Sequence, residues 1–539
     1  MHRNRSVDVH QFAMIPKADI PRSSFNCQST HKTTFDSGYL IPVYVDEVLP
    51  GDTFNLNMTA FARLSTPLFP IMDNMVMDSF FFFVPNRLLW SNWQKFMGQQ
   101  ENPGDSISYV VPQQVSPTGG YAVNSLQDYM GLPTVGQVDA AKTISHCAFW
   151  PRAYNLIWNE WFRDENLQTS AVVDKGDGPD VTPSTAYTLL RRGKRKDYFT
   201  SALPWPQKGA SVTIPMGTRA PIGMDPSNNN NQIVRFQSDR SIAAGQTNFG
   251  STSPDGYLQN GTTLNRLVID PNGTLYADLS QATAATINQL RQSFQIQRLL
   301  ERDARGGTRY TEIIRSHFGV TSPDSRLQRP EYLGGGTTQV QINPIAQTSA
   351  TGQTGATTPL GNLASMGTAL AHNHGFTQSF VEHGVIIGLV SIRADLTYQQ
   401  GLAKMWSRST RYDFYFPAFA HLGEQTILNK EIYAKGTTDD NNVFGYQERW
   451  AEYRYNPSRI SGLFRSTSAG TLDAWHLAQK FTTLPTLGNT FIEERPPVDR
   501  TLAVGAAANG KQFIFDSFFN VRKARPMPLY SVPGLIDHF

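Results

Sequence analysis

Phe80-Phe81-Phe82-Phe83-Val84 is one of the two most apolar stretches of the chain, and Val385-Ile386-Ile387-Gly388-Leu389-Val390 is the other. Both are far shorter than the ~20 residues that a helix needs to cross a bilayer. Short, continuous apolar runs of this kind are typical of strands buried in a protein core. We therefore predict a soluble protein built around buried strands of a β-sandwich.

Further strands are predicted on either side of these two runs. Tyr39 to Ala60 has β-type patterning around a turn at Pro50-Gly51-Asp52, and Phe513 to Val521 alternates near the end of the chain. The aromatic-rich stretch Tyr412 to Phe419 is also predicted to be a strand. Strands towards both ends of the chain, with helices and long loops between them, favour a two-sheet antiparallel sandwich whose loops are expanded.

Helices and long polar segments are predicted in the middle of the chain. The predicted helices are Leu88–Met97, Ala148–Leu167, Ala282–Asp303 and Thr311–Phe318. Residues 217–280 lack lysine and are dominated by Gly, Ser, Thr and Asn, and residues 334–375 are rich in Gly, Thr and Gln. We expect residues 217–280 to be a small ordered insertion, with a disordered linker as the alternative. Residues 334–375 are expected to form a long surface loop.

The composition is poor in charge for a chain of 539 residues. Charged residues make up 17% of the chain, against roughly 25% in ordinary soluble domains, while 40% hydrophobic residues supply a large core. A surface with few charges suits a protein that packs against neighbours in an assembly. The net charge of +3 is too small for a general nucleic-acid binder, so any such binding must come from local clusters.

The cysteines and the N-terminus bear on the cellular compartment. Cys27 and Cys147 are the two cysteines, and this low number favours buried free thiols in a reducing cytoplasm over a disulfide bridge. The N-terminus, Met1 to His10, is polar and lacks the apolar core of a secretory signal. We expect synthesis in the cytoplasm and no membrane insertion.

Three basic clusters are candidates for contact with single-stranded nucleic acid. The first is an extended arm over residues 1–35, with Phe12 and Phe25 among its cations; the others are Arg191–Lys196 and Arg522–Arg525. Cations attract phosphates and aromatic rings stack on unpaired bases. A solvated charge run is the alternative for each cluster, and inter-subunit salt bridges are a further alternative for Arg191–Lys196. The candidate nucleic-acid-binding residues are Arg3, Arg5, Lys17, Arg22, Arg522, Lys523 and Arg525.

No pattern in the chain indicates catalysis or a metal site. His372-Asn373-His374 with Glu382 invites comparison with the metal site of cupins, but the spacing is too wide, so a solvent-exposed or interface histidine pair is expected. Neither a GxSxG motif nor a Walker phosphate loop occurs. Glu493-Glu494 has no evident partner acid that would suggest a glycosidase. We therefore expect neither an enzyme nor a bound metal or cofactor.

Five segments carry a resemblance to a known family. They are Ser79–Trp90, Leu190–Thr200 with its continuation Leu203–Gly209, Leu299–Tyr310, Arg329–Gly335 and Ala451–Arg459. Together they resemble the major capsid proteins of the gokushovirus branch of the Microviridae, which are small single-stranded DNA bacteriophages. Each segment alone is moderately specific, but five in the same order over one chain are highly specific.

The resemblance implies a mainly β protein, an eight-stranded antiparallel jelly roll with long helix- and loop-containing insertions. It also implies a homo-oligomeric icosahedral shell of the simplest, T=1, kind around a circular single-stranded DNA genome. The further partners that it implies are a minor pilot protein, a small DNA-binding protein and a scaffolding protein. The expected divisions are an N-terminal arm over 1–35, a first part of the core over 36–216, a surface insertion over 217–280, and the remaining core with a helical insertion and tail over 281–539. The surface insertion is expected to form a protrusion at the three-fold axes and to meet a host receptor.

Two other classes of protein remain as alternatives. A non-viral jelly-roll protein that binds or cleaves carbohydrate would have an aromatic-lined cleft and would act as an isolated monomer. A minor structural or spike protein of the same kind of virus would not form shells alone. The size of the chain, its basic arm and the five segments favour the coat protein over both.

Overall fold

The computed structural model describes residues 21–180, 183–212, 287–321, 328–346, 348, 363–503 and 510–530, with six three-residue strands between residues 222 and 277. The chain divides into two compact units. One consists of Met1–Pro206 together with Gly306–Phe539, and the other is Gln207–Arg305. No helix among the described residues is both long and apolar enough to cross a membrane.

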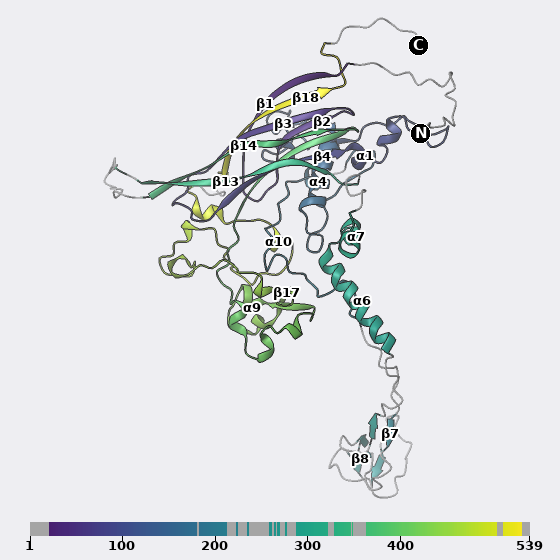
Figure 1. Ribbon diagram of the computed structural model, residues 1–539, viewed down its shortest axis with the longest axis vertical. Coiled ribbons are helices and arrows are strands. Elements are labelled where there is room, and N and C mark those ends of the chain that lie inside the picture. Colours follow the sequence, from purple (N-terminus) through teal and green to yellow (C-terminus); the bar gives the residue numbers. More distant parts are fainter. Residues whose placement is uncertain are drawn as a thin grey trace, which may run out of the picture. The chain divides into compact units, whose positions relative to one another are not determined.

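The larger unit is built on eight antiparallel strands (Figure 1). Their order is β1-β18-β3-β14-β13-β4-β15-β2, so two groups of four meet at the β13–β14 pair. When the eight strands are numbered along the chain, one group has the order 1-8-3-6. The other group has the order 5-4-7-2. This is the strand order of a jelly roll, so the predicted fold class is confirmed. The strands are β1 (Ser23–Phe35), β2 (Ile41–Val48), β3 (Thr53–Leu64), β4 (Met75–Pro85), β13 (Glu331–Ala346), β14 (Leu363–Ser379), β15 (Gly384–Ala394) and β18 (Phe513–Arg525).

The apolar runs in β4 and β15 reflect burial on both faces of these strands. Phe81 and Phe83 point into the core of the sandwich, whereas Phe82 and Val84 belong to a second core on the other side of the sheet. Alternate residues of β15 divide in the same way between the two cores. A strand covered on both faces has no polar face, which explains the continuous apolar sequence.

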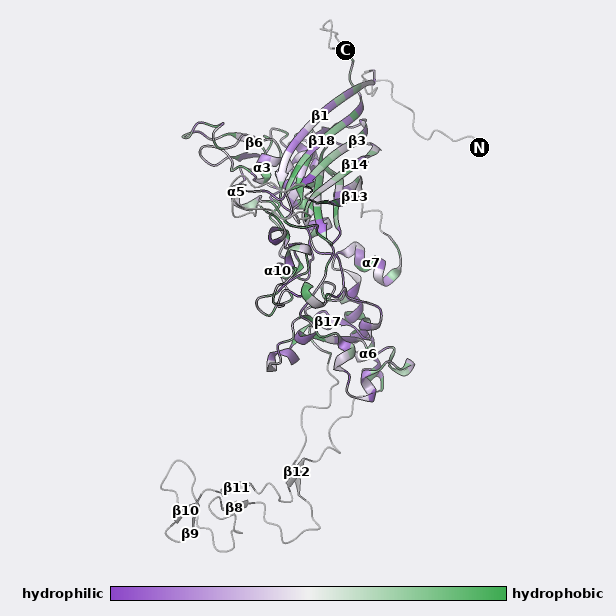
Figure 2. Ribbon diagram, turned by 90° about the vertical axis from the view of Figure 1, so that its left-hand side faces the viewer, coloured by the Kyte–Doolittle hydropathy of each residue, from purple (hydrophilic) through white to green (hydrophobic). Residues whose placement is uncertain are grey.

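The strands β3 and β18 are buried on one face. Their side chains alternate strictly between buried and more exposed positions, as the β-type patterning predicts. In β18, for example, Phe515 and Phe519 are buried, and the residue that follows each of them, Asp516 and Asn520, is exposed. The neighbouring strand β1 is coloured mostly white to purple in Figure 2, in keeping with its polar sequence.

Two long insertions interrupt the jelly roll. The first leaves after β4 and returns at β13, and the second leaves after β15 and returns at β18. The first contains β5 (Gln113–Val115), β6 (Ser145–Cys147), α1 (Asn86–Leu89), α2 (Trp93–Phe96), α3 (Leu126–Tyr129), α4 (Phe149–Ile157), a π-helical turn (Trp158–Phe162), α5 (Pro183–Ala186), α6 (Ile287–Gly306), α7 (Tyr310–Phe318) and the short strands β7 (Ile222–Met224), β8 (Val234–Phe236), β9 (Leu258–Asn260), β10 (Thr263–Asn265), β11 (Leu267–Ile269) and β12 (Leu275–Ala277). The second contains β16 (Glu424–Leu428), β17 (Val443–Glu448), α9 (Asn429–Ile432), α10 (Asn489–Ile492) and several 3-10 turns.

The prediction of a loop over residues 334–375 is wrong where β13 and β14 lie. Glycines suggested the loop, but here they allow close approach between strands. A Cβ atom on Gly335 would stand 2.0 Å from the backbone oxygen of Ser79, and one on Gly375 would stand 1.9 Å from that of Leu56. The sheet therefore requires glycine at these positions.

Three further expectations need correction. Residues 23–35 of the predicted arm form β1 and pair with β18 along their whole length. Tyr412–Phe419 is not a strand but two 3-10 turns, Arg411–Asp413 and Pro417–Phe419. Both thiols are free as expected, although Cys27 is exposed and Cys147 half-buried rather than both being buried.

The predicted helices are present with different bounds. Leu88–Met97 is represented by the two short helices α1 and α2, and Ala148–Leu167 ends at Phe162 after its π-helical turn. The helix predicted over Ala282–Asp303 is α6, and the one over Thr311–Phe318 is α7.

Candidate functional site

The candidate cations of the N-terminal arm lie mostly beyond the structure. Arg3, Arg5 and Lys17 are outside the described residues. Arg22 is exposed immediately before β1 and donates a hydrogen bond to the hydroxyl of Thr53. Its guanidinium therefore lies at the surface beside the start of β3.

The C-terminal cluster divides into one exposed cation and two that are paired inside the subunit. Lys523 forms an ion pair with Asp46, and Arg525 lies 3.4 Å from the buried carboxylate of Asp52. These two cations connect β18 to β2, which contains Asp46, and to the turn before β3, which contains Asp52. Arg522 is exposed and donates from Nε to the hydroxyl of Ser24 at 3.1 Å. Of the three, only Arg522 presents its side chain mainly to solvent.

The cluster Arg191–Lys196 is also engaged inside the subunit. The Arg191 guanidinium lies 3.9 Å from the ring centre of Tyr39 and donates to two backbone oxygens. Arg192 forms an ion pair with Asp78 in β4. These cations are therefore paired within the chain. The interpretations drawn from the sequence were contact with nucleic acid and salt bridges between subunits. The remaining pairs are Arg195 with Asp395 and Lys196 with Asp164.

Lys194 of this cluster and the nearby Glu494 are both buried, and burial shifts the pKa of each. Burial raises the pKa of Glu494 to about 7, although the charges of Lys194, Arg192 and Arg393 oppose that rise. Burial likewise lowers the pKa of Lys194 to about 8, against the attraction of Glu494. The folded protein therefore holds a proton on Glu494 at pH values where the unfolded chain has lost it.

This proton makes stability depend on pH. Because the pKa of Glu494 is raised from 4.5 to about 7 on folding, its contribution to the free energy of unfolding falls as pH rises through that range. Glu494→Gln removes this titration. The melting temperature of the variant minus that of the native protein is therefore expected to increase from pH 5 to pH 7. Differential scanning fluorimetry across this range measures the difference. A difference that is constant with pH would contradict the assignment.

A buried ion pair that the sequence interpretation missed anchors the first insertion. Arg152 of α4 and Asp180 are both almost completely inaccessible to solvent. Arg152 donates from Nε to Asp180 at 3.0 Å and from Nη1 to the backbone oxygens of Leu89 and Gly176. A lone arginine within the apolar sequence Phe149-Trp150-Pro151-Arg152-Ala153-Tyr154 is the signal that could have revealed this pair.

The two histidines differ: His372 is exposed, as expected of the pair, whereas His374 is buried and has a structural role. His374 is buried and lies within hydrogen-bond distance of Ser79 at 2.8 Å and Thr338 at 3.0 Å. Glu382 instead forms an ion pair with Arg87 at 2.8 Å. Among the described residues, no three His, Cys, Asp or Glu side chains are grouped in a way that could hold a metal ion.

The second insertion carries an exposed group of aromatic side chains. Tyr412, in the stretch predicted to be a strand, is 69% exposed, and Tyr453 is 52% exposed. We call this group the aromatic surface. It comprises Tyr412, Phe414, Tyr415, Phe416 and Tyr453.

Contacts with an arginine or a neighbouring ring join the members of the aromatic surface in two groups. The Arg408 guanidinium lies 5.4 Å from the ring centre of Phe414 and 4.4 Å from that of Tyr453. Phe419 lies 6.2 Å from both Tyr412 and Phe416. Tyrosine and arginine are enriched at the energetic centres of protein interfaces, whereas monomeric proteins rarely expose large apolar patches. The arrangement suits contact with another protein surface.

An eight-stranded jelly roll with such an exposed surface suits a structural subunit of an assembly. The chain belongs to the phage capsid protein (F protein) family, whose model matches residues 13–535. It is 49% identical to the capsid protein VP1 of Bdellovibrio phage phiMH2K and 45% identical to that of Chlamydia phage 1, in each case over 98% of both chains. Capsid protein VP1 of Spiroplasma virus 4 is 37% identical, also over 98% of both chains.

These relatives confirm the resemblance to gokushovirus coat proteins and decide between the classes that the sequence left open. The chain is a major capsid protein and a structural component of the phage virion rather than an enzyme. The non-viral carbohydrate-binding interpretation is thereby excluded.

Proposed function

We propose that copies of this chain self-assemble into a closed icosahedral T=1 shell around a circular single-stranded DNA genome. The aromatic surface is the observation that supports self-assembly most directly. It leaves rings such as Tyr412 and Tyr453 open in a single subunit, and burial against a neighbour removes their apolar area from water. Closed symmetric shells need several interfaces on each subunit, and the two long insertions of the jelly roll supply surface for them.

Genome enclosure rests on the relatives and on the basic segments of the chain. Arg22 and Arg522 are exposed candidates for phosphate contact, and Arg3, Arg5 and Lys17 precede the first described strand. We propose that the protein is made in the host bacterial cytoplasm. A scaffolding protein, a pilot protein and a small DNA-binding protein are the proposed partners during assembly there.

Electron microscopy tests self-assembly. The overexpressed full chain, alone and together with the other phage proteins, is expected to give round shells of one diameter by negative staining. The second arm is needed because coat proteins can depend on scaffolding. A chain that stays monomeric in both arms under all assembly conditions would overturn the proposal.

Residues 217–280 are proposed to meet the host receptor as a protrusion at the three-fold axes. Their inclusion in the separate compact unit Gln207–Arg305 supports a segment that can be removed without breaking the jelly roll. Polar insertions on a rigid scaffold are common sites of recognition. The short strand pairs between residues 222 and 277 agree with an ordered insertion.

Deleting residues 217–280 and closing the gap with a short Gly-Ser linker is expected to leave shell formation intact and to abolish attachment to host cells. The reason is that the jelly roll and the second insertion lie in the other compact unit. Shells are counted by negative staining, and attachment is measured as particles removed by host cells. A deleted protein that fails to fold would refute a separable protrusion, and one that still attaches would refute the receptor role.

A further inference from the structure

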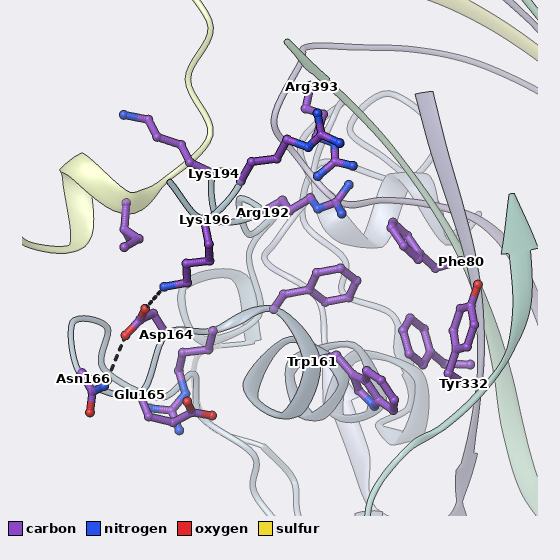
Figure 3. Close-up of a pocket in the computed structure, with 16 residues that line it drawn as sticks. Phe80, Trp161, Asp164, Glu165, Asn166, Arg192, Lys194, Lys196, Tyr332 and Arg393 are labelled. Atoms are coloured by element: carbon purple, nitrogen blue, oxygen red, sulfur yellow. Dashed lines mark hydrogen bonds and ion pairs between the residues drawn. The ribbon is translucent and has the colours of Figure 1, made fainter. Parts of the chain in front are cut away.

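A pocket of about 590 Å³ lies over the outer face of β4 (Figure 3). Its volume is within the range of roughly 300–1,000 Å³ that is usual for small-molecule sites. Figure 3 shows cationic side chains such as Arg192 and Arg393 on one side and Trp161 and Tyr332 on the other. We call this cavity the aromatic–basic pocket. No role in the shell described above uses it.

The aromatic side of the pocket presents two half-exposed rings. Trp161 is 45% exposed and Tyr332 is 43% exposed, and their ring centres lie 6.1 Å apart. Each packs against the buried ring of Phe82, at 5.5 and 5.6 Å. Trp161 also donates from Nε1 to the backbone oxygen of Pro330 at 2.9 Å, which fixes its orientation. The Arg329 guanidinium lies 5.1 Å from the ring centre of Trp161, and the exposed parts of both rings remain accessible to a planar ligand.

On the basic side of the pocket two arginines share one carboxylate, while the acids Asp164 and Glu165 also line the pocket. Arg192 and Arg393 both pair with a single carboxylate, that of Asp78, and Arg393 approaches it through Nε at 3.1 Å. Nη1 and Nη2 of Arg393 have no hydrogen-bond partner among the described residues. Burial and the charge of Arg192 lower the pKa of Arg393. An anion in the pocket would supply the missing acceptor and relieve the repulsion between the two guanidiniums.

Two more cations lie at the rim and can turn towards an anion. Arg195 and Lys196 are each paired with an acid, but both side chains are more than half exposed. Exposed ion pairs are weak and rearrange at little cost. Phe80 joins the two sides of the pocket, because the Arg192 guanidinium lies 5.0 Å from its ring centre and the Tyr332 ring lies 6.5 Å from it. Stacking and cationic groups are therefore close enough to meet one nucleotide.

We propose that the aromatic–basic pocket binds one nucleotide of single-stranded DNA, with its base stacked on Trp161 and Tyr332 and its phosphate held by Arg192 and Arg393. The inference rests on the proposed enclosure of a single-stranded DNA genome and names a site for it. A neutral sugar could stack on the same rings, but it would bring no negative charge to the two guanidiniums that share Asp78. The charge of the pocket therefore favours DNA over carbohydrate.

Binding of a short, fluorescein-labelled, mixed-sequence single-stranded oligodeoxynucleotide to the full chain, measured by fluorescence anisotropy, tests the pocket. Tyr332→Ser is expected to weaken binding about tenfold, because stacking contributes ~1–3 kcal/mol per base, whereas Tyr332→Phe should retain it. Arg393→Gln is expected to weaken binding and to lower the slope of affinity against salt by about one ion. The matched controls are Tyr310→Ser and Lys142→Gln, which change exposed residues outside the pocket.

The outcomes separate the pocket from the wider proposal. Unchanged affinity in Tyr332→Ser, in Arg393→Gln and in the exposed rim variant Arg195→Gln would overturn the pocket. If deoxyadenosine monophosphate binds as tightly as the oligonucleotide, the ligand of the pocket is a free nucleotide and not DNA. If cellohexaose displaces the oligonucleotide, the ligand is a carbohydrate. Wild-type particles without DNA would refute genome enclosure itself. Particles of these variants with full DNA content and unchanged oligonucleotide affinity would refute the pocket alone.

Discussion

Replacing Arg152 by alanine is expected to lower the free energy of unfolding by about 3–5 kcal/mol, the usual result of removing one partner of a buried ion pair. The variant leaves the carboxylate of Asp180 buried and charged, with Gln114 and Tyr187 as its remaining hydrogen-bond donors. It also removes the donors that serve the backbone oxygens of Leu89 and Gly176. Chemical denaturation of the purified protein measures the loss, and a low yield of soluble protein is expected to accompany it.

Arg87→Ala is the matched control for this prediction. Arg87 also pairs with an acid, Glu382, but both side chains are partly exposed, so the expected loss is below about 1 kcal/mol. Arg152→Lys keeps the charge without the planar fork of donors and is expected to fall between the two. Equal losses in Arg152→Ala and Arg87→Ala would show that the buried pair does not anchor the insertion.

The eight-stranded fold was predictable where burial leaves a simple pattern in the sequence. The Phe80–Val84 and Val385–Val390 runs are apolar because both faces of β4 and β15 are covered, and a continuous run of that length rarely arises in any other way. The alternation in β18 follows from one buried and one open face. These strands required no knowledge of distant partners.

The missed strands owe their sequence to their neighbours in the sheet. Gly334-Gly335-Gly336 resembles a flexible loop, yet a Cβ at each of these positions would collide with an adjacent strand. β1 has a largely exposed, polar sequence and is a strand because β18 pairs with it along its whole length. Information of this kind lies in three-dimensional contacts, so a single sequence does not reveal it.

The candidate site, like the fold, was predictable only in part from the sequence. Charge runs were visible in the sequence, but the acids that neutralise them lie far away along the chain, as Asp46 does from Lys523 and Asp78 from Arg192. The sequence therefore predicted where the cations are, and the structure was needed to separate paired from unpaired ones. The aromatic stretch Tyr412–Phe419 was predicted to be a strand because aromatic residues are common in strands, whereas here they lie exposed around two 3-10 turns.

Replacing Tyr412 by aspartate is expected to weaken shell formation strongly while leaving the subunit folded. Tyr412 is 69% exposed and its ring contact within the described chain is with Phe419, so the subunit loses little by the change. In a shell, the aspartate would be buried against a neighbour without a partner, which costs several kcal/mol at each contact. Every subunit carries the change, so the penalty recurs at each copy of the interface around the shell.

Sedimentation velocity and negative staining measure assembly, and the melting temperature of the subunit measures folding. The expected result is a melting temperature within a few degrees of the native value and at least a thirtyfold higher protein concentration for assembly, which corresponds to ~2 kcal/mol at an interface hot spot. Val381→Asp, which changes a single, highly exposed apolar residue between β14 and β15, is the matched control and should assemble normally. Normal shells from Tyr412→Asp and from a Tyr453→Asp variant would show that the aromatic surface faces solvent in the particle. Because these rings form an exposed aromatic group of the second insertion, loss of assembly in both variants would place that insertion at a subunit boundary.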